Sequence, residues 1–202
     1  MIKKLIFRFA RWFLNRGRVL TNPYYDPPTA QEMFSIQLDT FDVAVELILK
    51  HEGGYVNDPR DNGGETNFGI SKRAYPHLDI RNLTREQAIA IYKRDYWDKC
   101  RCDEMPSGLA LSVFDMAVNA GNNRAIRILQ YVLGVAVDGI IGSKTLEAAS
   151  KSNDTDIYEY ANQRLEFYQS LKTWPTFGRG WTRRTEETLA EALKLYEDDT
   201  RS

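Results

Sequence analysis

The sequence has few residues of the kinds that build disulfide frameworks or metal centres. Among 202 residues it has two cysteines, Cys100 and Cys102, and two histidines, His51 and His77. A bridge between cysteines one residue apart would close a small, strained ring, and a structural zinc site needs about four Cys or His ligands at suitable spacing. We therefore expect two ordinary thiols, no metal and no cofactor.

The sequence also lacks any run of about 18 or more apolar residues, so it contains no conventional membrane span. No acidic residue precedes Asp26, whereas six of the 27 basic residues do. The remainder carries 21 basic against 28 acidic residues, a balance of −7, and lacks the positive field typical of nucleic-acid-binding proteins. We expect no specific nucleic-acid partner, and one compact, monomeric body at this length.

Residues 1–20, MIKKLIFRFARWFLNRGRVL, predict a basic amphipathic helix. At about 100° per residue, its apolar side chains gather on one side and its basic side chains on the other. Arg8 and Arg11 interrupt the apolar stretches, which argues against a secretory signal. Three roles remain open: a helix lying on an anionic membrane, a helix docked on this protein or a partner, and an arm that binds nucleic acid.

The remaining chain predicts a linker followed by helices. Residues 21–37 carry three prolines and no helical period, as linkers do. Apolar stripes at helical spacing then recur, and alternating strands are almost absent outside a glycine-rich stretch. The fold class is therefore mainly α, with at most a small β-hairpin. The expected helices run from Asp39 or Thr40 to Gly53, from Thr84 to about Trp97, from Ser107, from Asn122 or Asn123 to Gly134, from Ser143, over about 154–172 and over about 182–199.

The glycine-rich stretch HEGGYVNDPRDNGGETNFGI, residues 51–70, contains side chains suited to glycosidic bond cleavage. That reaction needs a protonated carboxylic acid beside the leaving oxygen and a second polar group that manages a water. Glu52 lies at a helix carboxyl end, where unpaired carbonyls disfavour its ionisation by about 0.3–1 kcal/mol. Asp61 and Thr66 could hold a water across a cleft from it. The same composition also builds ordinary turns, so a purely structural loop stays open.

The segment EGGYVNDPRDNGGETNFGIS closely resembles the signature of glycoside hydrolase family 108, peptidoglycan-cleaving N-acetylmuramidases of phages and bacteria. The resemblance covers roughly residues 38–184, and residues from about 125 resemble the predicted peptidoglycan-binding region of that family. Further blocks follow in the family's order: YKRDYWDKC (92–100), LALSVFDMAVNAG (109–121), AIRILQYVLGVAVDGIIGSKT (125–145) and FGRGW (177–181).

The resemblance implies a lysozyme-like fold, with a catalytic region over residues 38–124 and a helical peptidoglycan-binding-like region over residues 125–202 packed with it. It implies hydrolysis of the β-1,4 bond between N-acetylmuramic acid and N-acetylglucosamine. We expect a phage endolysin that is made in the host cytoplasm and acts on periplasmic peptidoglycan. The competing interpretation is a non-catalytic wall-binding or membrane-docking adaptor on the same scaffold.

The resemblance also implies site residues. Glu52 is the expected catalytic acid, so its side chain must keep a proton near neutrality and must not be locked to an arginine. Asp61 and Thr66 match the order, but not the spacing, of the Glu, Asp and Thr series in lysozymes of tailed phages. Asp58 is the rival carboxylate, and the carboxylate separation decides between an inverting and a retaining mechanism; we expect inversion.

Six further residues are candidates for sugar binding, because sugars bind on aromatic faces and to amide or carboxylate groups. For Trp97, burial in the core is the competing interpretation. Asp115 and Asn119, four residues apart, share one helix face, and a helix-end hydrogen bond would explain them nearly as well. The six candidates are Tyr55, Asn67, Tyr96, Trp97, Asp115 and Asn119.

Deleting residues 1–20 should weaken binding to anionic vesicles while leaving hydrolysis of purified wall intact, because the deletion removes only the amphipathic segment. Vesicle co-sedimentation and a wall-clearing assay measure the two effects. Unchanged vesicle binding would reject the membrane role.

Overall fold

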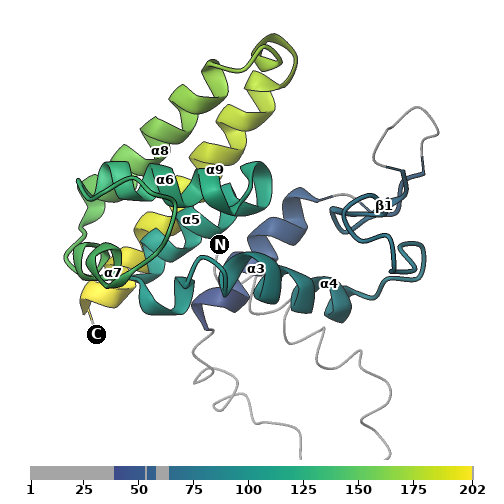
Figure 1. Ribbon diagram of the computed structural model, residues 1–202, viewed down its shortest axis with the longest axis horizontal. Coiled ribbons are helices and arrows are strands. Elements are labelled where there is room, and N and C mark those ends of the chain that lie inside the picture. The colour runs from purple at the N-terminus through teal and green to yellow at the C-terminus, as the bar shows by residue number, and fades with distance from the viewer. Residues whose placement is uncertain (1–38, 53, 58–63, 202) are drawn as a thin grey trace, which may run out of the picture. The chain divides into compact units, whose positions relative to one another are not determined.

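The computed structural model describes residues 39–52, 54–57 and 64–201. The predicted helix over residues 1–20, the linker over 21–37, and both Asp58 and Asp61 lie outside the described residues. From Asp39 onward the chain forms one compact unit. Its described part contains seven α-helices and one two-stranded antiparallel sheet (Figure 1). The predicted mainly α, lysozyme-like class with a small hairpin is confirmed.

The elements follow one another with short connections. A π-helical turn, Lys93–Trp97, continues α4, and a 3₁₀ turn, Cys102–Glu104, precedes α5. The helices and strands are α3 (Thr40–His51), β1 (Thr66–Asn67), β2 (Ile70–Ser71), α4 (Arg85–Tyr92), α5 (Ser107–Ala120), α6 (Asn122–Val132), α7 (Ser143–Ala149), α8 (Asp154–Gln169) and α9 (Trp174–Arg201).

Local capping chemistry sets several helix ends. Asp39 caps α3, and its carboxylate accepts a hydrogen bond from the Phe41 backbone N–H. Thr84 and Gln87 form the predicted capping box of α4. Gly134, with φ of 65°, follows the end of α6, as a residue in the left-handed region commonly does. These residues confirm the predicted starts of α3 and α4 and the predicted end of α6.

Helix α9 begins eight residues before the predicted start near residue 182. Its proline, Pro175, lies in the first turn, where the missing N–H has no intrahelical acceptor. Gly178 is buried because the Trp174 ring lies directly on it, and an added Cβ would come within 2.7 Å of that ring. Proline and glycine are common in loops. Here the place of Pro175 in the first turn and the packing of Trp174 on Gly178 make both residues compatible with a helix.

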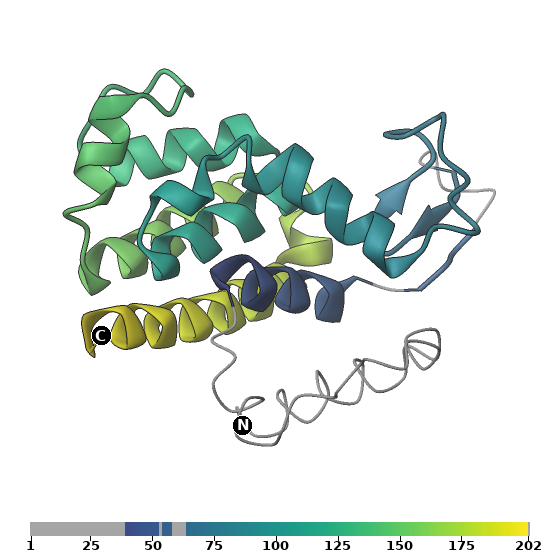
Figure 2. The same ribbon diagram turned by 90° about the horizontal axis from the view of Figure 1, so that it is seen from below.

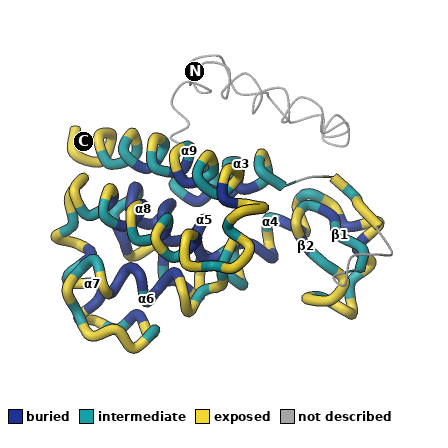
Figure 3. Tube along the Cα trace, turned by 90° about the horizontal axis from the view of Figure 1, so that it is seen from above, coloured by how far each residue is buried: buried dark blue, intermediate teal, exposed yellow. Residues whose placement is uncertain are grey.

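The core surrounds α5, whose residues from Gly108 to Ala117 are all buried. Helices α3, α6, α8 and α9 all pack against α5, which is among the dark elements in the burial view (Figure 3). The hairpin β1–β2 lies at one end of the unit and α7 at the other, with α3 and α4 leading toward the hairpin (Figure 2).

Both cysteines are buried free thiols, as predicted. Within residues 39–52, 54–57 and 64–201, no helix is long and apolar enough to cross a membrane.

The crossing of α5 and α9 depends on Gly108. A Cβ there would lie under 3.0 Å from the Ala192 carbonyl oxygen and 2.8 Å from the Ile157 side chain. Gly108→Ala should therefore lower the free energy of unfolding by about 1–3 kcal/mol. Gly180→Ala is the matched control, because nothing lies near its Cβ position and alanine favours a helix by about 1 kcal/mol. Urea unfolding measures both; equal effects would contradict the close crossing.

Candidate active site

Glu52 is positioned by the end of α3. Its backbone turns to an extended conformation, φ −84° and ψ 138°, and its N–H still donates to the Ile48 carbonyl at 3.0 Å. The side chain is 23% exposed. The structure therefore places a partly accessible carboxyl group at a helix carboxyl end, as the sequence predicts.

The hairpin turn packs against this carboxyl group. Phe68 and Gly69 both have positive φ, 50° and 75°, as the two central residues of a tight hairpin turn require. A Cβ on Gly69 would lie 2.6 Å from Glu52 Oε2 and 2.6 Å from the Tyr92 hydroxyl. That hydroxyl donates to the Phe68 carbonyl at 2.7 Å, which ties the turn to α4. Only glycine fits between the turn and the carboxyl group.

On its other side, Glu52 joins a row of four charged side chains from four helices. Glu52 Oε1 accepts from Arg184 Nη1 on α9 at 3.1 Å. Arg184 Nε donates at 3.0 Å to Oδ1 of Asp115 on α5, and Nη2 lies 2.9 Å from the same oxygen. Nη2 of Arg164, on α8, lies 2.5 Å from Asp115 Oδ2. We call these four residues the charge network.

The charges in this network hold one another in place. Burial would raise the pKa of the fully buried Asp115, but Arg164 and Arg184 outweigh it and set that pKa to about 2. Burial would lower the pKa of each arginine, yet the neighbouring carboxylates raise both. Asp115 is thus ionised between two guanidinium groups.

The structure contradicts the expectation that Glu52 has no arginine partner. A neighbouring guanidinium favours the ionised carboxylate, which is opposite to what a general acid needs before it gives up a proton. The contact is partial, however. Only Oε1 contacts Arg184, while Oε2 faces the hairpin turn. Arg184 directs its Nε and Nη2 to Asp115 instead.

His51 is the last residue of α3, as predicted. Its Nε2 lies 3.6 Å from Glu187 on α9. Burial, followed by the charge of Arg184, lowers the pKa of His51. The histidine is therefore neutral at pH 7 and adds no charge beside Glu52.

Three of the predicted site residues lie around the hairpin. Thr66 forms reciprocal 2.8 Å backbone hydrogen bonds with Val56. Tyr55 lies under the Arg81 guanidinium, 5.5 Å from the ring centroid. Asn67 is buried, and its amide donates to the Ile80 and Leu83 carbonyls, which ties the hairpin to the loop before α4. The structure gives Asn67 a structural contact, and Asp61 lies outside the described residues.

Two further predicted residues, Trp97 and Tyr96, lie on the π-helical turn in different environments. Trp97 is 1% exposed, with its ring 5.3 Å from those of Phe41 and Phe114, and its indole N–H donates to Asp103. It is a core residue. Tyr96 is only partly buried, and burial raises its pKa. It is therefore the more accessible of the two residues.

Asp115 and Asn119 share one face of α5, as their spacing predicts, but their surroundings differ. Asp115 is fully buried in the charge network, so the structure makes it an anchor for arginines. Asn119 is exposed at the end of α5, and its Oδ1 accepts from the Tyr168 hydroxyl at 2.7 Å. The same hydroxyl accepts from Arg164 Nε at 3.2 Å. Asn119 thus lies on the surface next to the network.

Sequence reasoning missed Arg164, Arg184 and Gly69. One signal was available for Arg164: it follows Ile157, Tyr160 and Ala161 at helical spacing along the buried face of α8. A charged residue in such a stripe indicates a buried partner of opposite charge. No comparable pattern marks Arg184, because it lies among other charged residues in GWTRRTEE.

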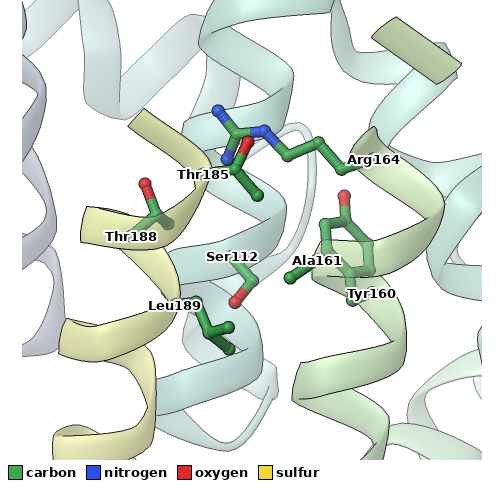
Figure 4. Close-up of a pocket in the computed structure, with 7 residues that line it drawn as sticks. All are labelled: Ser112, Tyr160, Ala161, Arg164, Thr185, Thr188 and Leu189. Carbon is green, nitrogen blue, oxygen red and sulfur yellow. The ribbon is translucent and has the colours of Figure 1, made fainter. Parts of the chain in front are cut away.

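The helices around the network leave little empty space. A cavity of about 10 Å³ lies where α5, α8 and α9 meet, and Figure 4 shows Arg164 and Thr185 at one end of it. Such a volume holds at most about one water molecule. A sugar could reach Glu52 only from its exposed side.

Asp115→Asn should lower the free energy of unfolding by about 3–5 kcal/mol, because it leaves two buried guanidinium groups without their carboxylate. Since the folded pKa of Asp115, about 2, lies below its usual 3.8, its stabilisation is present above pH 3.8 and is lost as the pH falls through about 2. The variant should therefore lose less stability than the wild type between pH 4 and pH 2.

Urea unfolding across that pH range measures both effects. Asp98→Asn, at a side chain 51% exposed, is the control and should change stability by at most about 1 kcal/mol. Equal effects of the two substitutions would contradict the buried network.

Comparison with known proteins bears on the family of this chain. The glycosyl hydrolase 108 family model matches residues 45–121, and a model described as a predicted peptidoglycan domain matches residues 124–186. No curated protein matches the chain. The structure of SagA from Brucella abortus is similar, with a TM-score of 0.71 and 38% sequence identity, over 78% of this chain and 95% of that one. The chain therefore belongs to the glycosyl hydrolase 108 family, as a glycoside hydrolase of peptidoglycan.

Proposed function

We propose that this protein is an N-acetylmuramidase with Glu52 as its general acid. The bond cleaved is the β-1,4 bond between N-acetylmuramic acid and N-acetylglucosamine. The observation that carries the proposal is the position of Glu52, a partly exposed carboxyl group at the end of α3 between the Gly69 turn and Arg184. Among the proposed sugar-binding residues, Tyr96 is partly buried and Asn119 is exposed, so both are accessible to a glycan.

In this reaction the O–H bond of Glu52 breaks and its proton goes to the glycosidic oxygen. The electron pair of the glycosidic C–O bond stays on that oxygen. One water adds to the sugar carbon and gives a proton to the second carboxylate, for which Asp61 is proposed, so the products are two glycan ends, an ionised Glu52 and a protonated base. Asp61 and Thr66 are the proposed partners that hold the water. We propose inversion of configuration, which places the water on the face of the sugar opposite Glu52.

For the biological role, we propose a phage endolysin that acts as a monomer on the periplasmic wall of its host. Contact of residues 1–20 with an anionic membrane is part of this proposal. It is supported by the basic amphipathic pattern of that segment alone.

A second candidate is a non-catalytic adaptor that binds the wall on a lysozyme-like scaffold. The observation that favours it is the ion pair between Glu52 and Arg184, because a carboxylate held by an arginine is a poor proton donor at rest. The glycine turn packed against Glu52 favours the enzyme, since an adaptor has no need of so confined a carboxyl group.

Glu52→Gln should reduce cleavage of a Gram-negative wall by at least about 100-fold, because the amide has no proton to donate to the leaving oxygen. Mass spectrometry of the digest should detect new reducing sugar ends with the wild type and none with the variant. Glu147→Gln, at a side chain 69% exposed, is the control and should digest like the wild type. A folded Glu52→Gln protein that still clears the wall would contradict the proposal, and new free amino groups would indicate a peptidase or amidase instead.

A further inference from the structure

We propose that Arg184 is a positioning residue for Glu52, and that residues 124–186 complete the active site in addition to any contact they make with the wall. This inference rests on the proposed role of Glu52 as the acid. It goes beyond that role, because it assigns the placement of the acid to a helix outside the segment that matches the hydrolase family.

The two parts of the chain contribute opposite charges to the network. Both carboxylates, Glu52 and Asp115, come from the segment that matches the hydrolase family, residues 45–121. Both guanidinium groups, Arg164 and Arg184, come from the segment that matches the peptidoglycan domain, residues 124–186. Neither segment can balance these charges alone, so the site depends on their packing.

Contacts with Asp115, on the side away from Glu52, hold Arg184 in place. Its side chain is 11% exposed, and its Nε and Nη2 are engaged with Asp115. Arg164, only 2% exposed, pins the second oxygen of Asp115 and donates to the Tyr168 hydroxyl. Because the guanidinium group is a rigid planar fork, fixing two of its nitrogens fixes the direction of Nη1, which contacts Glu52.

Glu52 is therefore clamped between two fixed features. Arg184 holds Oε1, and the Gly69 turn lies against Oε2. A proton donor is effective only when it lies within hydrogen-bond reach of the leaving oxygen, and a displacement of about 1 Å can cost about 100-fold in rate. Arg184 and the Gly69 turn together hold the carboxyl group of Glu52 in one position.

The same contact has an electrostatic consequence. The guanidinium group of Arg184 lies 3.1 Å from Glu52 Oε1, and an opposite charge at that distance stabilises the carboxylate that forms as Glu52 gives its proton to the leaving oxygen.

The test compares Arg184→Met and Arg184→Lys with Arg183→Met, an exposed neighbour on the same helix. The full chain is assayed on soluble peptidoglycan fragments for kcat and KM separately. Pelleting with insoluble wall measures wall binding, and thermal unfolding shows which variants are folded.

For Arg184→Met we expect kcat to fall about 10- to 100-fold, with KM and wall binding within about twofold of the wild type. Arg184→Lys keeps the positive charge but should recover kcat only in part, because a lysine cannot bridge two carboxylates in a fixed plane. Arg183→Met should behave like the wild type.

Two outcomes would overturn the inference: a wild-type kcat in either Arg184 variant, or an equal loss of kcat in Arg183→Met. If Arg184→Met does not fold, the kcat of Arg184→Lys alone tests the inference: a reduced kcat supports it, and a wild-type kcat overturns it. An active Glu52→Gln protein would remove the proposed function itself. An inactive Glu52→Gln protein together with fully active Arg184 variants would remove only the role of Arg184.

Discussion

A buried carboxylate between two arginines is the interaction on which the arrangement of this protein depends. Asp115 is fully buried on α5 and contacts Arg164 from α8 and Arg184 from α9. Taking charges out of water is costly unless each finds a partner in good geometry, so the three helices are restricted to positions in which these groups meet. The packing around α5 and the surroundings of Glu52 follow from the same contact.

This constraint explains why Glu52, the proposed acid, lies where two segments meet. Glu52 ends α3 and is enclosed by a hairpin turn from one direction and by α9 from the other. A short helix end by itself could not keep a carboxyl group in one place, since such ends fray. The hairpin and α9 together give a fixed position to a side chain that stays partly open to solvent.

Much of the fold could be predicted from the sequence, because helix starts and stops are local. The capping residues Asp39, Thr84 and Gly134 act through neighbours within a few positions, and each marks a helix end as expected. The location of Glu52 at a helix end has the same local origin. The start of α9 was misplaced because the packing of Trp174 on Gly178 overrides the usual preference of glycine and proline for loops.

The partners of the site could not be predicted in the same way. The contact between Glu52 and Arg184 joins residues 132 positions apart, and nothing in the local pattern around Arg184 distinguishes it from its charged neighbours. Asp115 and Trp97 were expected at the sugar, yet helical spacing gives only the face on which a side chain lies, and depth in the core depends on which helices cover that face.

The order of the charge network along the chain has a consequence for biosynthesis. Glu52 and Asp115 are translated well before Arg184, and α9 follows every other element of the site. A nascent chain that has reached α8 therefore carries the acidic groups without the guanidinium group that holds Glu52. The charge network is therefore complete only after α9, the last described helix, has been made and has packed against α5 and α8.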